Sequence, residues 1–186
     1  MTVRRSIRRG YTLVELLITV ALLGLAAAVI VPQFTGTENM RVQAAVRQII
    51  ADLTFAQSDA LAFQEFRRVH FFEDGSGYCI VRVDETDFAD EFDPDAADYI
   101  VDPLASSDEG NLYIVDFTRD ARFSGVVISD VALDDGWRSV VYDPIGGTIM
   151  SGNLPGSGGS ITVEGANVRF RITVAPFTGK LSVTEL

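Results

Sequence analysis

The stretch that decides the fold lies near the start of the chain, where residues 4–31 read RRSIRRGYTLVELLITVALLGLAAAVIV. Four arginines come first, and an apolar run from residue 16 to residue 31 follows them. At about 1.5 Å per residue, a helix over residues 11–31 is long enough to cross a bilayer. Glu15 is the one charged residue in that span. A carboxylate within a membrane costs roughly 2.5–3.5 kcal/mol at the centre and less near an end, so Glu15 is a candidate functional residue.

The order of these features distinguishes the segment from a secretory signal peptide. A signal peptide places its small-residue cleavage site after the apolar stretch. In this chain the small residue, Gly10, directly follows the arginines and precedes the apolar run. One alternative stays open from the residues alone: an ordinary single-span anchor whose Glu15 side chain reaches to the membrane interface.

Residues 10–17, which read GYTLVELL, resemble the processing site of type IV prepilins and of the pseudopilins of type II secretion, usually Gly-Phe-Thr-Leu-x-Glu. The resemblance implies cleavage after Gly10 by a prepilin peptidase and N-methylation of the new terminus at Tyr11. It also implies that Glu15 pairs with the terminal amine of a neighbouring subunit and sets the register of assembly. Tyr11 departs from the commoner phenylalanine, and we expect the change to be tolerated.

Charge is distributed unevenly along the chain. The net charge is −11, and removal of residues 1–10 takes four basic and no acidic residues, which leaves −15. Since the arginines precede the apolar run and the acids follow it, the positive-inside rule places the leader in the cytoplasm and the remainder outside. An acidic head repels nucleic acid, so nucleic acid is not an expected partner. A single cysteine, Cys79, permits no internal disulfide.

Beyond the apolar run a helical pattern continues with one apolar face, formed by Val42, Val46, Ile49, Leu53, Ala56, Ala60 and Phe63. The polar residues assigned to the other faces are Arg41, Arg47, Gln48, Asp52, Gln57 and Asp59. We therefore expect one stem helix over residues 11–64, roughly 80 Å long at the standard rise. Residues 11–32 would be its transmembrane, filament-core half and residues 33–64 its amphipathic half.

Gly24 and Pro32 interrupt this stem pattern. Both weaken helix hydrogen bonding and are candidate sites of bending or local melting. Both are also tolerated in membrane helices without any special role. The two interpretations are equally supported.

After the helix the apolar period changes from 3.6 to 2. We expect strands at residues 68–73, 78–84, 112–117, 125–129, 139–142, 161–163, 168–174 and 181–184, with turns at 74–77, 143–147 and 153–159. The first two strands form a hairpin in which Phe72 would lie opposite Cys79. One long helix followed by short strands predicts an α+β fold, with a β-rich head over residues 65–186 whose antiparallel sheet packs on the helix.

Two segments of this head narrow the resemblance. Residues 141–146 read VYDPIG, and residues 168–181 end in APFTGKL. They are similar to the strand, Pro-x-Gly turn and late strand pair of H-type minor pseudopilins and of their FimT-type minor pilin relatives. The resemblance implies a pilin-like fold, a long helix on a sandwich-like head, with a role near the tip of a filament.

An acidic stretch over residues 84–98 contains Asp84, Glu85, Asp87, Asp90, Glu91, Asp93, Asp95 and Asp98. Clustered carboxylates can bind calcium, but the spacing lacks the central glycine and closing glutamate of an EF-hand loop. A solvated loop is the preferred interpretation, and neither a metal nor another cofactor is expected. His70 and Cys79 are the single histidine and cysteine. The expected hairpin register places them diagonally, about 7–8 Å apart, whereas a nucleophilic pair must come within hydrogen-bonding reach. No enzymatic activity is expected.

These observations predict a structural minor subunit of a type II secretion pseudopilus, which supports export of folded proteins across the outer membrane. Its expected partners are the prepilin peptidase, other pseudopilins or minor pilins, the inner membrane, and a secretion or pilus assembly platform. The expected location is the inner membrane, with one span and a periplasmic head, followed by incorporation into the periplasmic pseudopilus. Two alternatives remain: a type IV minor pilin for pilus assembly, adhesion or DNA uptake, and a membrane-anchored binding domain without a filament.

Overall fold

The computed structural model describes residues 12–85, 92–103 and 111–186, with side chains 27–38 excepted. The chain divides into two compact units, Met1–Thr37 and Glu38–Leu186. Gly10 and Tyr11, the predicted cleavage and methylation site, lie outside the described residues.

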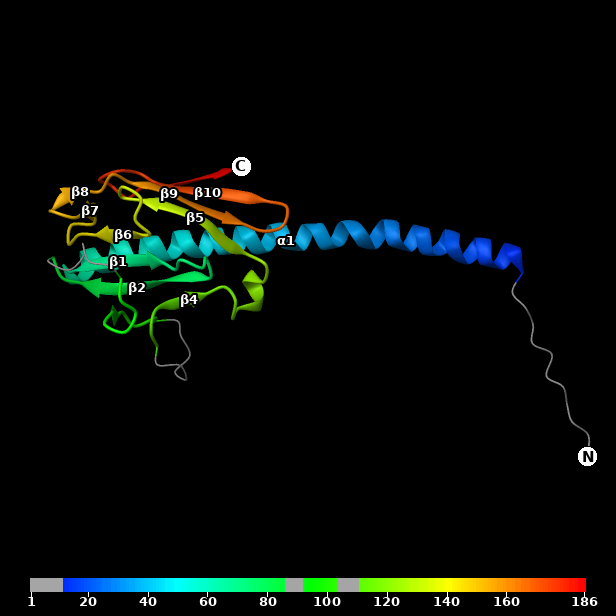
Figure 1. The fold of residues 1–186 in the computed structure, drawn as a ribbon, viewed down its shortest axis with the longest axis horizontal. Coiled ribbons are helices and arrows are strands. Elements are labelled where there is room, and N and C mark those ends of the chain that lie inside the picture. The colour runs from blue at the N-terminus through cyan, green and yellow to red at the C-terminus, as the bar shows by residue number, and fades with distance from the viewer. Residues whose placement is uncertain (1–11, 86–91, 104–110) are drawn as a thin grey trace, which may run out of the picture. The chain divides into compact units, whose positions relative to one another are not determined.

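A single helix, α1 (Leu13–Phe63), forms the described N-terminal part of the chain and contributes to both units (Figure 1). It ends within a residue of the predicted boundary, because Gln64 takes a left-handed conformation with φ of 55°. The Glu65 amide then donates to the Ala60 carbonyl at 3.2 Å, as in a Schellman cap. Within the described residues, no helix combines the length and the apolar character that a membrane crossing requires. The span over residues 11–32 stays a prediction.

The second unit is an α+β arrangement in which one face of α1 enters the core. The buried side chains on this face are Val42, Ala45, Val46, Ile49, Leu53, Ala56 and Ala60. They confirm the predicted apolar face except at its last member, because Phe63 is 66% exposed. The helix ends at Phe63, whose ring lies 5.8 Å from the guanidinium carbon of Arg67 instead of entering the core.

The larger of two antiparallel sheets in the described residues has seven strands, in the order β3-β2-β1-β6-β7-β8, with β4 also paired to β2. Its strands are β1 (Phe66–Phe71), β2 (Gly77–Val83), β3 (Asp98–Tyr99), β4 (Ile114–Asp116), β6 (Ser139–Tyr142), β7 (Thr148–Met150) and β8 (Leu154–Pro155). A short 3₁₀ helix, η1 (Ala121–Phe123), follows β4. Core-facing side chains of this sheet include Val69, Phe71, Tyr78, Ile80, Val140 and Tyr142.

The smaller sheet has the order β11-β10-β9-β5. Its strands are β5 (Val127–Leu133), β9 (Gly159–Glu164), β10 (Arg169–Val174) and β11 (Leu181–Glu185). In β10, buried and exposed side chains alternate strictly, so Phe170, Ile172 and Val174 face the core. One link between the sheets is the Ile128 amide, which donates to the Gly75 carbonyl at 3.0 Å. Sandwich-like stacking of the sheets stays a prediction.

The period-two pattern located most strands but set one register incorrectly. Cys79 pairs with His70, not with Phe72, because the first strand begins and ends two residues earlier than predicted. The short strands β3, β7 and β8 were not predicted, and β8 lies inside the stretch assigned to a turn at residues 153–159. Strands of two or three residues are too short to show an alternating pattern.

Candidate functional site

The predicted assembly residue, Glu15, lies in the first turn of α1. The Thr12 hydroxyl oxygen accepts a hydrogen bond from the Glu15 amide at 3.2 Å, and the Thr12 carbonyl accepts one from Leu16 at 3.1 Å. Thr12 therefore caps the helix, because its side chain satisfies an amide that has no partner within the first turn. Glu15 stands at the third helical position, where a carboxylate interacts favourably with the positive end of the helix dipole.

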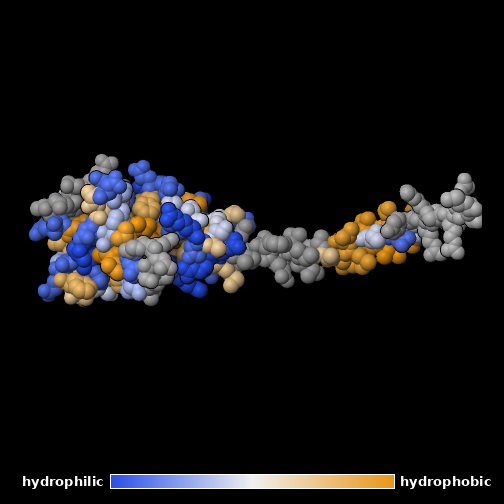
Figure 2. Space-filling model, turned by 90° about the horizontal axis from the view of Figure 1, so that it is seen from below, coloured by the Kyte–Doolittle hydropathy of each residue, from blue (hydrophilic) through white to orange (hydrophobic). Residues whose placement is uncertain are grey.

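Around Glu15 the helix exposes apolar side chains on all sides. The large ones are Leu13, Val14, Leu16, Leu17, Ile18, Val20, Leu22, Leu23 and Leu25, each at least 54% exposed. Figure 2 shows this described part of the helix as hydrophobic nearly throughout, in contrast to the mixed surface of the head. Such a surface marks an interface with protein or lipid. Glu15 is the one charged side chain among residues 12–26.

The predicted bending sites are not tested. α1 continues across Gly24 and Pro32, and a Cβ atom added at Gly24 would meet no atom within 4 Å. Gly24 therefore serves no close packing contact among the described residues. Its role in bending, and that of Pro32, stays a prediction.

A second acidic residue of α1, Asp52, is buried, which the sequence did not predict. Its carboxylate is only 3% exposed and accepts hydrogen bonds from the Tyr78 hydroxyl at 2.5 Å and the Tyr113 hydroxyl at 3.0 Å. The Gln48 amide donates to the same carboxylate at 2.9 Å. Burial raises the pKa of the Asp52 carboxyl, and the hydrogen bonds that it accepts oppose this rise. The carboxylate thus joins the helix to β2 and to the segment before β4.

Two further polar residues of the helix are turned toward the head. The Gln57 side-chain amide donates to the carbonyls of Gly146 at 2.6 Å and Thr178 at 3.0 Å, which belong to two different turns. Asp59 accepts from Arg67 of β1 at 2.5 Å, and Arg67 is 1% exposed.

Asp52, Gln57 and Asp59 were assigned to helix faces outside the apolar stripe, and the structure shows that all three nevertheless bond to the head. The head covers more of the helix than its apolar stripe. Tyr78 could have indicated a buried polar partner on the helix. It shares the core-facing side of β2 with Ile80, and a tyrosine hydroxyl in the core requires a hydrogen-bond partner.

His70 and Cys79 are adjacent in the larger sheet. The His70 ring bonds to the Ser139 hydroxyl at 2.8 Å and stacks on Phe92 at 4.0 Å between centroids. Burial lowers the pKa of His70 to about 4 and raises the pKa of the Cys79 thiol to about 12. Near neutral pH the pair is therefore an uncharged imidazole and an uncharged thiol.

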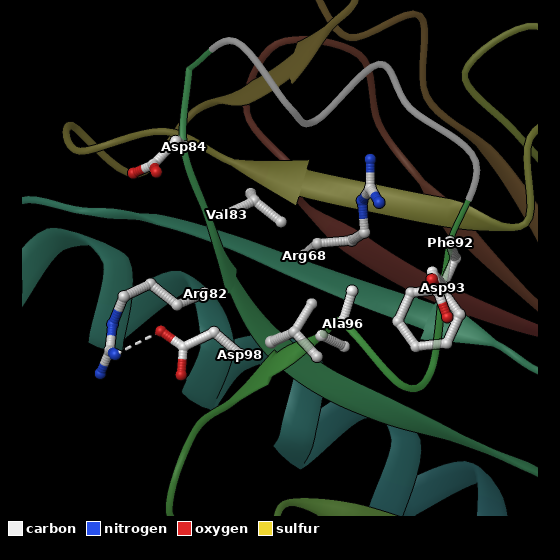
Figure 3. A pocket seen from close by; sticks show the side chains of 10 residues that line it. Arg68, Arg82, Val83, Asp84, Phe92, Asp93, Ala96 and Asp98 are labelled. Atoms are coloured by element: carbon white, nitrogen blue, oxygen red, sulfur yellow. Dashed lines mark hydrogen bonds and ion pairs between the residues drawn. The ribbon is translucent and has the colours of Figure 1, made fainter.

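Part of the predicted acidic loop lines a pocket of about 420 Å³ (Figure 3). Arg68 and Phe92 line one part of the hollow, and the Arg82–Asp98 ion pair of 2.7 Å lies at another. Asp87, Asp90 and Glu91 lie outside the described residues. Among the residues that are described, no cluster of three or more metal-binding side chains occurs. Calcium binding by this stretch is not tested.

Comparison with known proteins yields one match, to the N-terminal segment. Residues 5–31 match the family model of the prokaryotic N-terminal methylation motif. No curated protein and no solved structure matches the chain. The matched range contains Gly10, Tyr11 and Glu15, the residues that the sequence singled out. The match supports a type IV pilin-like protein with a membrane-anchored N-terminus, processed by a prepilin peptidase and assembled with other pilins.

Proposed function

We propose that this chain is a minor subunit of a type II secretion pseudopilus, of the H type, and that its role is structural. The observation that carries the proposal is the N-terminal order of arginines, Gly10, Glu15 and apolar helix, which coincides with the methylation-motif match. Peptidase cleavage after Gly10 and methylation at Tyr11 prepare the helix for assembly from the inner membrane into the filament.

Assembly by this route has a physical basis at Glu15. An isolated carboxylate among apolar side chains in a membrane is costly, and the described residues around Glu15 offer no side-chain cation. The terminal amine that cleavage creates on a neighbouring subunit supplies one. Pairing the two replaces an expensive charge with a satisfied pair and fixes the register between helices.

The head contributes a rigid attachment to the stem. Asp52, Gln57 and Asp59 each hydrogen-bond the helix to a different part of the head. Displacement of the helix relative to the strands would leave the Asp52 carboxylate buried without partners, which is strongly unfavourable. A head fixed in this way moves together with the amphipathic half of the helix, which suits a mechanical subunit.

Mass spectrometry of the protein purified from its native membrane tests the proposal. We expect a mature terminus at Tyr11 that carries one N-methyl group, and we expect Gly10→Val to retain the leader because the added side chain crowds the scissile bond. Gly24→Ala, which changes a glycine beyond the cleavage site, is the matched control and should be processed. A mature parent chain that still begins at Met1 would instead support a plain membrane anchor.

A type IV minor pilin is the second candidate, because the matched motif fits both systems. The charge of −15 after leader removal disfavours the DNA-uptake version of this role. Deletion of the gene separates the candidates. Loss of exported folded proteins from the medium supports the pseudopilus, whereas loss of surface pili with secretion intact supports the pilin.

A further inference from the structure

The smaller sheet has one edge that is protected and one that is not. Among the described residues, β11 pairs with β10 alone, and Figure 1 shows it as the outermost strand of its sheet. An unpaired strand edge presents free amide and carbonyl groups and is a template for another strand.

Other described sheet edges carry features that block such pairing. β5 has a bulge between Ile128 and Asp130, and its Ile128 amide is bonded to Gly75. β8 has two residues and ends in Pro155. β3 and β4, which share an edge of β2, have two and three residues. β11 has five residues in regular register, without proline or bulge. It therefore lacks the shortness, proline and bulge that protect the other edges, and its one core-facing charged side chain is that of Glu185, opposite Phe170.

The backbone of β11 offers hydrogen-bonding groups at defined positions. The Leu186 amide donates to the Arg169 carbonyl at 2.9 Å, which identifies one hydrogen-bonded pair of the β10–β11 ladder. Such pairs recur at every second residue, so Ser182 and Thr184 also bond to β10. The amides and carbonyls of Val183 and Glu185 then point away from the sheet.

The side chains of this edge define what an added strand must carry on its core-facing side. Val183 lies opposite Ile172 on that side. Ile172 is completely buried, whereas Val183 is 42% exposed because none of the described strands lies beyond it. An apolar side chain on an added strand would cover Val183.

The opposite side of the edge is positively charged. Arg171 lies opposite Thr184, and Lys180 directly precedes β11. Both are exposed, and within the described residues no hydrogen bond or ion pair engages either charged group. The nearby Arg169 is already paired with Glu164 at 2.7 Å. In a mature chain of net charge −15, this local excess of cations favours an acidic partner.

We propose that β11 binds an extended segment of another protein as an added strand, apolar on the face toward Val183 and acidic on the face toward Arg171 and Lys180. Backbone hydrogen bonds would supply affinity, and the alternating side chains would supply specificity. This inference concerns the head and does not depend on the processing of the N-terminus.

The test uses the full chain in detergent and a fluorescent synthetic peptide that alternates valine with glutamate. We expect saturable binding by anisotropy, together with slower amide exchange at Val183 and Glu185 but not at Ser182 and Thr184. A peptide that alternates valine with lysine should bind about tenfold more weakly or less.

Two variants separate the backbone from the charge contribution. Val183→Pro removes an outward amide and should weaken binding about tenfold. Arg171→Glu should do the same through repulsion, whereas Arg47→Glu, an exposed arginine of α1, should leave binding unchanged. The amide-exchange pattern and Arg171→Glu remain decisive if Val183→Pro perturbs the fold.

Three results would overturn the proposal. The first is absence of saturable binding to the parent, and the second is equal binding of the acidic and basic peptides. The third is protection of the Val183 and Glu185 amides that rises with protein concentration in the absence of peptide, which would identify a second copy of this chain as the occupant.

Discussion

The two halves of α1 carry their acidic residues in opposite settings. In residues 13–26 every side chain is exposed, and Glu15 lies on an apolar surface whose described contacts are those of its own first turn. In residues 42–63 one face is buried, and Asp52 is enclosed with two tyrosine hydroxyls and an amide as donors. The carboxylate of one half is satisfied within the head, and the other half presents an apolar surface that no described residue covers.

This contrast shows that polar residues within an apolar helix can serve two purposes. A carboxylate with partners in its own chain fixes the position of the helix against the head. A carboxylate without such partners is costly in an apolar environment. Assembly lowers this cost only when a neighbouring subunit places a cation beside the carboxylate. Stability should therefore depend on Asp52 and assembly on Glu15.

The largest effect is expected at Glu15, on assembly alone. Replacement of Glu15 by Val would remove the proposed registry pair, which we take to be worth about 3 kcal/mol, and should lower incorporation into filaments roughly a hundredfold. Membrane abundance should hold or rise, because an apolar helix inserts more easily. Quantitative cross-linking of subunits and immunoblots of the membrane fraction measure the two quantities. Filaments of parental yield from Glu15→Val would disprove the registry role.

The converse effect is expected at Asp52. Asp52→Ala leaves the buried Tyr78 hydroxyl without an acceptor and opens a cavity, so the free energy of unfolding should fall by about 2–4 kcal/mol. Urea denaturation of the full chain in detergent, followed by tyrosine and tryptophan fluorescence, measures the loss. Arg47→Ala, an exposed change on the same helix, should alter it by less than about 0.5 kcal/mol. Equal stability of the two variants would show that the Asp52 hydrogen bonds do not hold the helix.

Much of this architecture could be predicted from periodicity. The change of period after residue 64 located the helix end within one residue and the strand at residues 139–142 without error. The apolar face from Val42 to Ala60 was also correct. These features are local, because a repeat of 3.6 or 2 residues determines which side chains share a face.

The errors concern features that local pattern does not contain. The contacts of Asp52 and Gln57 with the head were not predicted, because their partners lie 26 or more positions away in sequence. The His70–Cys79 register depended on where β1 ends, which the pattern located two residues too late. The processing residues were identified by motif alone, and Gly10 and Tyr11 lie outside the described residues.

A smaller effect is expected from His70, which should make the stability of the head depend on pH. The apolar half of the helix carries no histidine and should not share this dependence. Burial lowers the pKa of His70 from 6.5 to about 4. Between these two pH values the imidazole therefore binds a proton in the unfolded chain but not in the folded one. The contribution to stability is fully present above pH 6.5 and is lost as pH falls towards 4. We expect a loss of about 2 kcal/mol, allowing for the partial exposure of the ring.

Denaturation of the parent and of His70→Gln at pH 7 and pH 4.5 measures this contribution as a difference between the two proteins. Subtraction removes the titration of carboxyl groups, which both proteins share. The parent should lose more stability than His70→Gln over this interval. An equal loss would mean that the folded head accommodates the imidazolium.

The smallest effect concerns how the head-facing half of the helix holds two distant turns. Gln57→Ala removes the bonds to the Gly146 and Thr178 carbonyls, both partly open to solvent, so we expect a loss of about 1 kcal/mol. Amide exchange should quicken within residues 143–147 and 175–179 and stay unchanged at Gly75. Ser58→Ala is the matched control, because the hydroxyl of Ser58 donates to the Thr54 carbonyl of its own helix and not to a turn of the described head. If exchange in the two turns were the same in Gln57→Ala as in Ser58→Ala, the helix would not be what stabilises them. The hydrogen bond from the Thr148 amide to the Phe177 carbonyl would then suffice to hold the turns together.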